Sequence, residues 1–269
     1  MSSPNQTSGL RHIVITGASS GIGRALALHY AASGVLLSLT GRDEARLAET
    51  VQACAARGAG VASARIDVMD APAIERWLHA RDEAQPVDVI VAAAGIGGAD
   101  VVPTANGESA ALAGAIFGVN TLGVVNTVAP LLPRMVARKR GQVAVVGSIA
   151  GRLGLPQSPV YSASKAAVHI YADGLRRLVA PHGVSITTIV PGFVDTPMSQ
   201  SLAMSRPFCW SAGRAAARIA RAIERRERRC IFPWPLRVAT ALAQIVPVPI
   251  LDFFLTRANT IVSPGRSRT

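Results

Sequence analysis

A glycine-rich turn near the amino terminus constrains the fold of this chain more than any other feature. The segment TGASSGIG places Gly17, Gly21 and Gly23 after the apolar run of residues 12–16 and before a stretch with helical character. Glycine allows a sharp strand-to-helix turn, and the free N–H groups at a helix amino terminus favour a bound phosphate. The spacing alone is weak evidence, but its place at the first strand-to-helix turn indicates a dinucleotide-binding fold.

The rest of the chain alternates apolar runs with helical stretches. Strands are expected at residues 12–16, 35–40, 61–67, 87–94, 142–148, 184–192 and 229–232. Helices are expected at about residues 22–33, 43–57, 71–84, 108–138 and 159–180. Runs such as residues 143–146 are continuously apolar, which is typical of strands covered on both faces. The pattern predicts one α/β domain, a doubly wound parallel sheet of the Rossmann type with helices on both faces.

We divide the chain into three parts. Residues 1–10 are expected to form a disordered leader, residues 11–232 a dinucleotide-binding catalytic domain with a lid at about 196–213, and residues 233–269 an extension. No apolar run of about 18 residues occurs, and the leader lacks an apolar core, so neither a spanning helix nor a signal peptide is expected. Three widely spaced cysteines suit a reducing cytoplasm, and the five histidines lack metal-ligand spacing, so no metal is expected.

The end of the second predicted strand bears on which dinucleotide binds. The segment LTGRDE has no acidic residue at Thr40 or Gly41 to hold an adenosine ribose 2′-hydroxyl, and Arg42 is its first charge. A guanidinium there suits a 2′-phosphate, which favours NADP(H) over NAD(H), unless Arg42 is only a solvated loop residue. Asp67, at the end of the third strand, is placed either to reach the adenine edge or to cap the next helix.

The segment YSASK places Tyr161 four residues before Lys165 in a predicted helix. Residues i and i+4 share a helix face, so the ammonium is expected to favour the phenolate and to lower the pKa of the phenol. Such a phenol can give a proton to a carbonyl or take one from an alcohol. Ser148, at the end of the fifth strand, can hydrogen bond the reacting oxygen. Asn120 is a poor helix former within the long helix and is, on its own, better explained as structural.

Taken in order, TGASSGIG, VNTLG, VGSIAG, YSASK and PGFVDTPM resemble the short-chain dehydrogenase/reductase family over about residues 10–200. The resemblance implies an NAD(P)-dependent oxidoreductase with Tyr161 as general acid/base and Ser148 on the carbonyl oxygen. Lys165 would bind the nicotinamide ribose and tune the phenol, and Asn120 would anchor a water relay. The cofactor site that it implies consists of Gly17, Ser19, Ser20, Gly21, Ile22, Gly23, Arg42, Asp67, Val68, Ala94, Gly95, Tyr161, Lys165, Pro191, Gly192, Val194 and Thr196.

Two positions depart from the family's pattern. An Asn-containing segment is usual after the fourth strand, but residues 92–95 read AAAG, so side-chain amide bonds to the neighbouring sheet are lost. This departure bears on local stability more than on chemistry. Ser20 stands where many NADP-dependent members carry a basic residue, which tempers the preference for NADP(H).

The C-terminal third allows several interpretations. Apolar residues between 202 and 210 fit either a hydrophobic substrate or a lid that packs on the core. Residues 214–229 carry seven arginines against two glutamates, and the apolar segment that follows contains four prolines, which argue against a span. A basic cluster beside an apolar segment fits peripheral contact with anionic lipid, while a homo-oligomer interface and a flap over the active site stay open. No nucleic-acid motif is present.

We therefore expect a cytoplasmic, NADPH-preferring oxidoreductase that interconverts a carbonyl and an alcohol on a hydrophobic substrate. A homo-dimer or tetramer is expected, with peripheral membrane contact through the tail as an open alternative. The competing hypothesis is a non-catalytic NADP-binding sensor or scaffold that docks on membranes. The formal charge of +12 does not decide between them, because charge alone is a weak guide to a partner.

Overall fold

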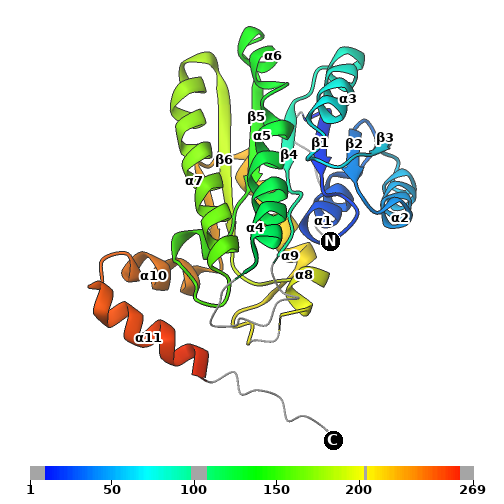
Figure 1. The fold of residues 1–269 in the computed structure, drawn as a ribbon. Helices are drawn as coiled ribbons and strands as arrows, with labels where there is room; N and C mark the ends of the chain where they lie inside the picture. Colours follow the sequence, from blue (N-terminus) through cyan, green and yellow to red (C-terminus); the bar gives the residue numbers. More distant parts are fainter. Residues whose placement is uncertain (1–9, 98–107, 203–204, 261–269) are drawn as a thin grey trace, which may run out of the picture.

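The computed structural model describes residues 10–97, 108–202 and 205–260 of the chain. At its centre lies a seven-stranded parallel sheet flanked by helices, as Figure 1 shows. Its strands are β1 (His12–Thr16), β2 (Leu36–Gly41), β3 (Gly60–Arg65), β4 (Val89–Ala92), β5 (Gly141–Val146), β6 (Val184–Pro191) and β9 (Arg229–Phe232). They pair in the order β3-β2-β1-β4-β5-β6-β9, so the strand order reverses between β1 and β4. The predicted doubly wound α/β fold is confirmed, and its switch point lies between these two strands.

The sheet is buried because its strands are apolar on both faces. All five residues of β1 are buried, with Ile13 and Ile15 in one core cluster and Val14 in the other. The helices over the first face are α1 (Gly21–Tyr30), α2 (Glu44–Ala55) and α9 (Ala212–Glu224). Those over the second are α3 (Ala71–Ala84), α5 (Gly123–Val128), α6 (Leu132–Ala137) and α7 (Pro159–Val179). Burial of apolar surface stabilises a fold by roughly 25 cal/mol per Å², so this two-sided core is the main stabilising feature.

The helix expected over residues 108–138 is not continuous. It consists of α4 (Ala110–Phe117), a π-helical segment, η1 (Gly118–Leu122), then α5 and, after a turn, α6. Pro130 lies in that turn, where its missing N–H cannot continue a helix. The stretch Ala110–Ala137 is the one helical run among the described residues that is long and apolar enough to cross a membrane, with mean hydropathy 1.6. Half of its apolar window is buried and α5 and α6 pack on the sheet, which is how a core helix passes the same test.

The arginine-rich stretch 214–229, expected as a basic cluster beside an apolar segment, folds for the most part into a core helix. Most of it is α9, whose alanines and isoleucines are buried against the sheet. Arg225, Arg226 and Arg228 lie before β9 and Arg229 is its first residue, whereas the apolar tail begins after that strand. Arg214, at the start of α9, lies against Trp210, which stacks on Phe232 at the end of β9. The buried face of this core helix was hard to recognise in the sequence, because most of it is alanine, which is only weakly hydrophobic, and arginines stand between the alanines.

The last third also contains elements that the sequence did not indicate. A two-stranded sheet pairs β7 (Val194–Asp195) with β8 (Trp210–Ser211), and α8 (Pro197–Gln200) lies between them. The extension folds into α10 (Trp234–Ala243) and α11 (Val248–Thr260). The division into leader, domain and extension stays a prediction, since residues 1–9 and 261–269 lie outside the described part.

Candidate active site

The glycine turn at the end of β1 is packed so tightly that side chains would not fit. Gly17 has φ +69°, and a Cβ there would lie 2.7 Å from the Cα of Ala94. A Cβ on Gly23 would lie 2.3 Å from the carbonyl oxygen of Gly17. The turn between β1 and α1 therefore packs against the segment after β4, at the switch point where open α/β sheets bind ligands.

The amino terminus of α1 fits an anionic group. Ser20 is its N-cap residue but makes no side-chain capping bond, and the first turn carries no acidic residue. The first N–H groups of a helix have no partner within the helix and attract phosphate. Gly21 has φ +55° and faces the Thr196 side chain, with 3.3 Å between a built Cβ and Cγ2. Glycines, helix terminus and Thr196 together form a cradle that suits a dinucleotide pyrophosphate.

The other sequence-predicted cofactor residues lie along the same edge of the sheet. Ser19 packs under Gly41 at the end of β2, and Ile22 packs against the core at the start of α1. Val68 is buried against Gly123 after β3. The remaining members, at the ends of β4, β6 and β7, are Ala94, Gly95, Pro191, Gly192 and Val194.

Asn120 lies in the π-helical segment and ties three parts of the site together. Its Oδ1 accepts a hydrogen bond from the Ile96 N–H at 2.8 Å, and its Nδ2 donates to the Ile96 carbonyl at 2.9 Å. Nδ2 also donates to the Ser164 hydroxyl on α7 at 3.1 Å. Asn120 thus holds the loop after β4 against α7 and supplies amide bonds that the AAAG segment lacks. π-helical segments frequently mark functional sites.

Tyr161 and Lys165 lie on one face of α7, as their spacing predicts. The Lys165 ammonium is 5.8 Å from the centre of the Tyr161 ring and donates to the Val146 carbonyl at 3.0 Å. Lys165 is only 4% exposed, and burial lowers its pKa to about 8. A built Cβ on Gly95 would come within 3.4 Å of Nζ and 3.2 Å of the Asn120 amide oxygen, so Lys165 and Asn120 face the same small space.

The direction of the Tyr161 pKa differs from the sequence argument. Burial raises the pKa of Tyr161, and a side-chain hydrogen bond with Ser148 lowers it only in part. The expected lowering of this pKa by Lys165 is therefore wrong for this structure, because desolvation of the phenolate outweighs the hydrogen bond with Ser148. A phenol is protonated at neutral pH already at its ordinary pKa of about 10, so Tyr161 carries a proton that it can donate, although the raised pKa makes it a weaker acid.

Ser148 lies two residues after β5, and a residue of α7 holds it in place. Its hydroxyl caps η2 (Ile149–Arg152) by accepting from the Ala150 N–H at 3.1 Å. Its own N–H donates to Nε2 of His169 at 3.4 Å. Burial first, and then Lys165 and two arginines, lower the pKa of His169 to about 4, so the ring is neutral and can accept this bond. Sequence analysis missed His169, although it follows Lys165 by four residues and so shares its helix face.

The adenosine end of the site is more open. Arg42 and Asp67 lie beside each other after β2 and β3, with 3.9 Å between Nη1 and Oδ2, and both side chains are exposed. Oδ1 of Asp67 accepts from the Met69 N–H at 3.0 Å. Asp70, not Asp67, caps α3, so the suggestion that Asp67 caps that helix is wrong. The pairing leaves Arg42 able to turn toward a 2′-phosphate, because exposed ion pairs contribute little.

The predicted lid is anchored to the core in its second half. Trp210 stacks on Phe232 with 5.0 Å between ring centres, and the Arg214 guanidinium lies 3.9 Å from the Trp210 ring. Phe208 is exposed, whereas Met204 lies outside the described residues. The sequence left two interpretations of this apolar segment, a hydrophobic substrate site or a lid that packs on the core. Trp210 packs on the core.

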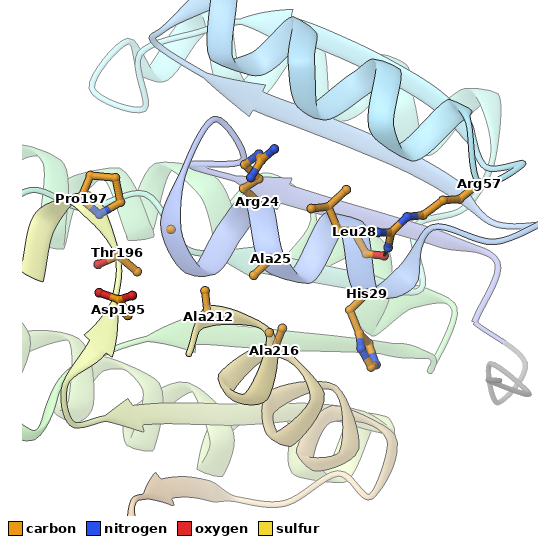
Figure 2. A pocket seen from close by; sticks show the side chains of 12 residues that line it. Arg24, Ala25, Leu28, His29, Arg57, Asp195, Thr196, Pro197, Ala212 and Ala216 are labelled. Atoms are coloured by element: carbon orange, nitrogen blue, oxygen red, sulfur yellow. Dashed lines mark hydrogen bonds between the residues drawn. The ribbon is translucent and has the colours of Figure 1, made fainter. Parts of the chain in front are cut away.

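A hollow of about 480 Å³ runs along α1 between that helix and α9, as Figure 2 shows. Gly21 and Thr196 line one end of it, and Arg24, His29 and Arg57 line the rest together with small apolar residues. It borders the cradle but contains none of the four candidate catalytic residues, so it is not the substrate pocket. Among the described residues, no group of His, Cys, Asp or Glu could hold a metal ion.

Fold, glycine cradle and switch point together define a dinucleotide-binding α/β protein. A family model described as short chain dehydrogenase matches residues 11–206. The chain therefore belongs to the short-chain dehydrogenase/reductase family, and the predicted membership is confirmed. It is an oxidoreductase that uses a nicotinamide dinucleotide.

Similar proteins cover nearly the whole chain. An uncharacterized oxidoreductase of Myxococcus xanthus is 35% identical over 90% of this chain and 95% of its own. A short chain dehydrogenase/reductase of Burkholderia phymatum, solved in complex with NAD, has a TM-score of 0.79 at 26% identity and covers 96% of this chain and 98% of its own. A short-chain dehydrogenase of Sphingobium yanoikuyae, solved in complex with NADPH, has a TM-score of 0.76 at 24% identity, over 97% and 98% of the two chains.

Proposed function

We propose that this protein is an NADPH-preferring reductase or dehydrogenase that interconverts a carbonyl and an alcohol on a hydrophobic substrate. The observation that carries the proposal is the partly buried Tyr161, hydrogen bonded with Ser148 and close to the Lys165 ammonium. Acid, oxygen partner and cation are the groups that carbonyl reduction needs.

In the mechanism we propose, the dinucleotide, when bound, supplies or accepts hydride at its nicotinamide ring. The glycine cradle would hold its pyrophosphate, and Lys165 would hold the nicotinamide ribose. Ser148 donates a hydrogen bond to the carbonyl oxygen and keeps it beside the phenol. Tyr161, a phenol that is protonated at neutral pH, gives its proton to that oxygen as negative charge develops. In the reverse direction the phenolate accepts the proton of the alcohol.

Two supporting residues keep these groups in place. His169 accepts the Ser148 N–H and so orients the peptide that carries the hydroxyl. Asn120 fixes the loop after β4, on which Gly95 approaches Lys165. Both act through other residues, and pre-positioned donors cost no reorganisation during the reaction.

The preference for NADP(H) rests on Arg42. Its guanidinium is exposed beside the end of β2, and its ion pair with Asp67 is long, at 3.9 Å. Arg42 can therefore leave Asp67 at little cost when a phosphate binds. A planar, permanently charged fork matches a phosphate better than a ribose hydroxyl. Because the structural neighbours include one solved with NADPH and one with NAD, fold alone does not set the preference.

The test is consumption of NADPH and of NADH against ketones and aldehydes graded by chain length. We expect turnover that rises with the apolar length of the substrate and a higher kcat/KM with NADPH. Tight binding of the cofactor without turnover across the whole series would contradict the proposal and would favour a non-catalytic NADP-binding sensor. A kcat/KM that favours NADH would overturn the cofactor preference alone.

For assembly and location we propose a cytoplasmic homo-dimer or tetramer with peripheral membrane contact. Large apolar side chains exposed on α7, Ile170 and Leu178, support self-association. Light scattering of the purified protein tests it, and a monomer at all concentrations would contradict it.

A further inference from the structure

The C-terminal helices present an exposed apolar surface that the catalytic site does not use. Half of the large apolar side chains exposed in the described part of the chain lie within residues 234–253. On α10 they recur as Trp234, Val238 and Leu242, at spacings of four residues, and Ile245 follows three residues later in the turn after the helix. These spacings place them on one helix face, which we call the outer stripe. Trp234 is 73% exposed and Ile245 is 78% exposed, and Val248 and Ile250 continue the surface onto α11.

The opposite face of α10 attaches the helix to the active-site edge. Thr240 is buried and accepts from Nε of Arg152 at 3.1 Å, and Gln244 accepts from Nη2 of the same arginine at 3.1 Å. Arg152 ends the short helix that Ser148 caps. Leu236 packs on Gly192, where a built Cβ would lie 2.7 Å from Cδ1. Figure 1 shows that α10 lies outside the two helix layers that flank the sheet. Its outer stripe is therefore a pre-formed surface fixed beside the site.

The charge of the extension decides between its two plausible occupants. Residues 233–269 carry four arginines and one acid, namely Arg237, Arg257, Arg266, Arg268 and Asp252. A twofold interface at the outer stripe sets α10 of two copies against each other, and α10 carries Arg237 and no acid. An anionic lipid surface instead attracts each basic residue by about 1 kcal/mol. Tryptophan also prefers the level of the lipid headgroups, where Trp234 at one end of the stripe would lie.

We propose that the outer stripe of α10, continued by the start of α11, docks on an anionic lipid surface and holds the active-site edge at that surface. The inference deepens the peripheral contact proposed above and names the face and the lipid chemistry. It gives a hydrophobic substrate a short path from the lipid to Ser148. Arg225, Arg226 and Arg228 are not part of the proposed surface, because they precede β9, whereas α10 follows it.

The test is sedimentation of the full chain, with NADPH, with vesicles of phosphatidylcholine alone or mixed with phosphatidylserine. We expect binding to the mixed vesicles that weakens with salt, and a loss of at least about tenfold in the double variant Leu242→Glu/Ile245→Glu. The control is Ile170→Glu/Leu178→Glu, which puts two charges on exposed apolar positions of α7 and should bind vesicles like the wild type. Because these two side chains are proposed to support self-association, light scattering measures the oligomeric state of the control on the same samples. Arg237→Gln keeps the stripe and should weaken binding about fivefold.

Three results would overturn the inference. The first is a wild type that does not bind mixed vesicles. The second is a Leu242/Ile245 variant that binds them as well as the wild type does. The third is a wild type that does not bind vesicles and forms a dimer that this variant dissociates. In the last case a second copy covers the stripe. Turnover of a soluble carbonyl, measured on the same samples, separates the two proposals: all variants should keep it, and its absence in the wild type contradicts the oxidoreductase assignment without touching lipid binding.

Discussion

The two ends of the candidate cofactor site are built differently. At the reacting end, Lys165 is 4% exposed and donates a hydrogen bond to the Val146 carbonyl. The side-chain amide of Asn120 is hydrogen bonded to Ile96 and Ser164. At the adenosine end, the Arg42 side chain is 57% exposed and meets Asp67 only at 3.9 Å. Substitutions at the first end should cost both stability and chemistry, whereas those at the second should change only which dinucleotide is preferred.

The difference follows from where each end lies in the fold. The reacting groups come from β5, η1 and α7, which pack against one another, so each side chain has several fixed neighbours. Arg42 stands on a loop after β2 and can move without breaking a core contact. Buried polar groups must be bonded, and this requirement fixes their geometry, while an exposed charge is free to follow its ligand.

The largest effect should come from Gly23→Ala in the buried cradle. A Cβ there would lie 2.3 Å from the Gly17 carbonyl oxygen, and backbone cannot yield as a flexible side chain can. We expect unfolding to become easier by about 3 kcal/mol or more and dinucleotide affinity to fall at least tenfold. Chemical denaturation and cofactor titration measure the two quantities.

Gly174→Ala is the matched control for that substitution. Gly174 lies on α7 with nothing within 4 Å of a built Cβ, so alanine should stabilise the helix by about 1 kcal/mol. If the two variants have the same stability and cofactor affinity, close packing is not the reason that the turn requires glycine.

A middle-sized effect is expected from His169→Gln, which tests how the reacting end depends on pH. The folded-state pKa of His169 is lowered from 6.5 to about 4, so the unfolded chain takes up the proton first. Acid therefore favours unfolding, and up to about 3 kcal/mol of stability should be lost as pH falls from 6.5 to 4.

Glutamine does not titrate and keeps an acceptor for the Ser148 N–H. The variant should show a shallower fall of stability with acid, measured by denaturation at a series of pH values. The fall should not vanish, because burial also lowers the pKa of His12 and of His29. If stability falls with acid as steeply in the variant as in the wild type, His169 is not a group that the fold keeps neutral.

The smallest effect is expected at the adenosine end. Arg42→Ala should reduce the ratio of kcat/KM for NADPH to that for NADH about tenfold and leave stability within about 0.5 kcal/mol. Arg46→Ala removes a neighbouring guanidinium that pairs with Asp43 and should leave the ratio unchanged. Equal ratios for Arg42→Ala and the wild type would remove the argument for NADP(H).

The sequence was sufficient for the sheet and for the spacing of Tyr161 and Lys165, because both depend on local periodicity. It was insufficient wherever three-dimensional packing decides. The raised pKa of Tyr161 follows from burial, which no spacing displays. The π-helical segment at Asn120 and the contact of His169 with Ser148 join elements far apart in the chain. In α9 the buried face is mostly alanine, so its arginines dominated the pattern.

The measurement that tests the account most directly is turnover by Tyr161→Phe beside Tyr171→Phe, with cofactor affinity measured on the same samples. Both tyrosines lie on α7 and burial raises the pKa of each, but Tyr161 is the one hydrogen bonded with Ser148. We predict that Tyr161→Phe lowers kcat at least about a hundredfold with unchanged cofactor binding, while Tyr171→Phe keeps near-normal turnover. Near-normal turnover by Tyr161→Phe on a good substrate would contradict the account.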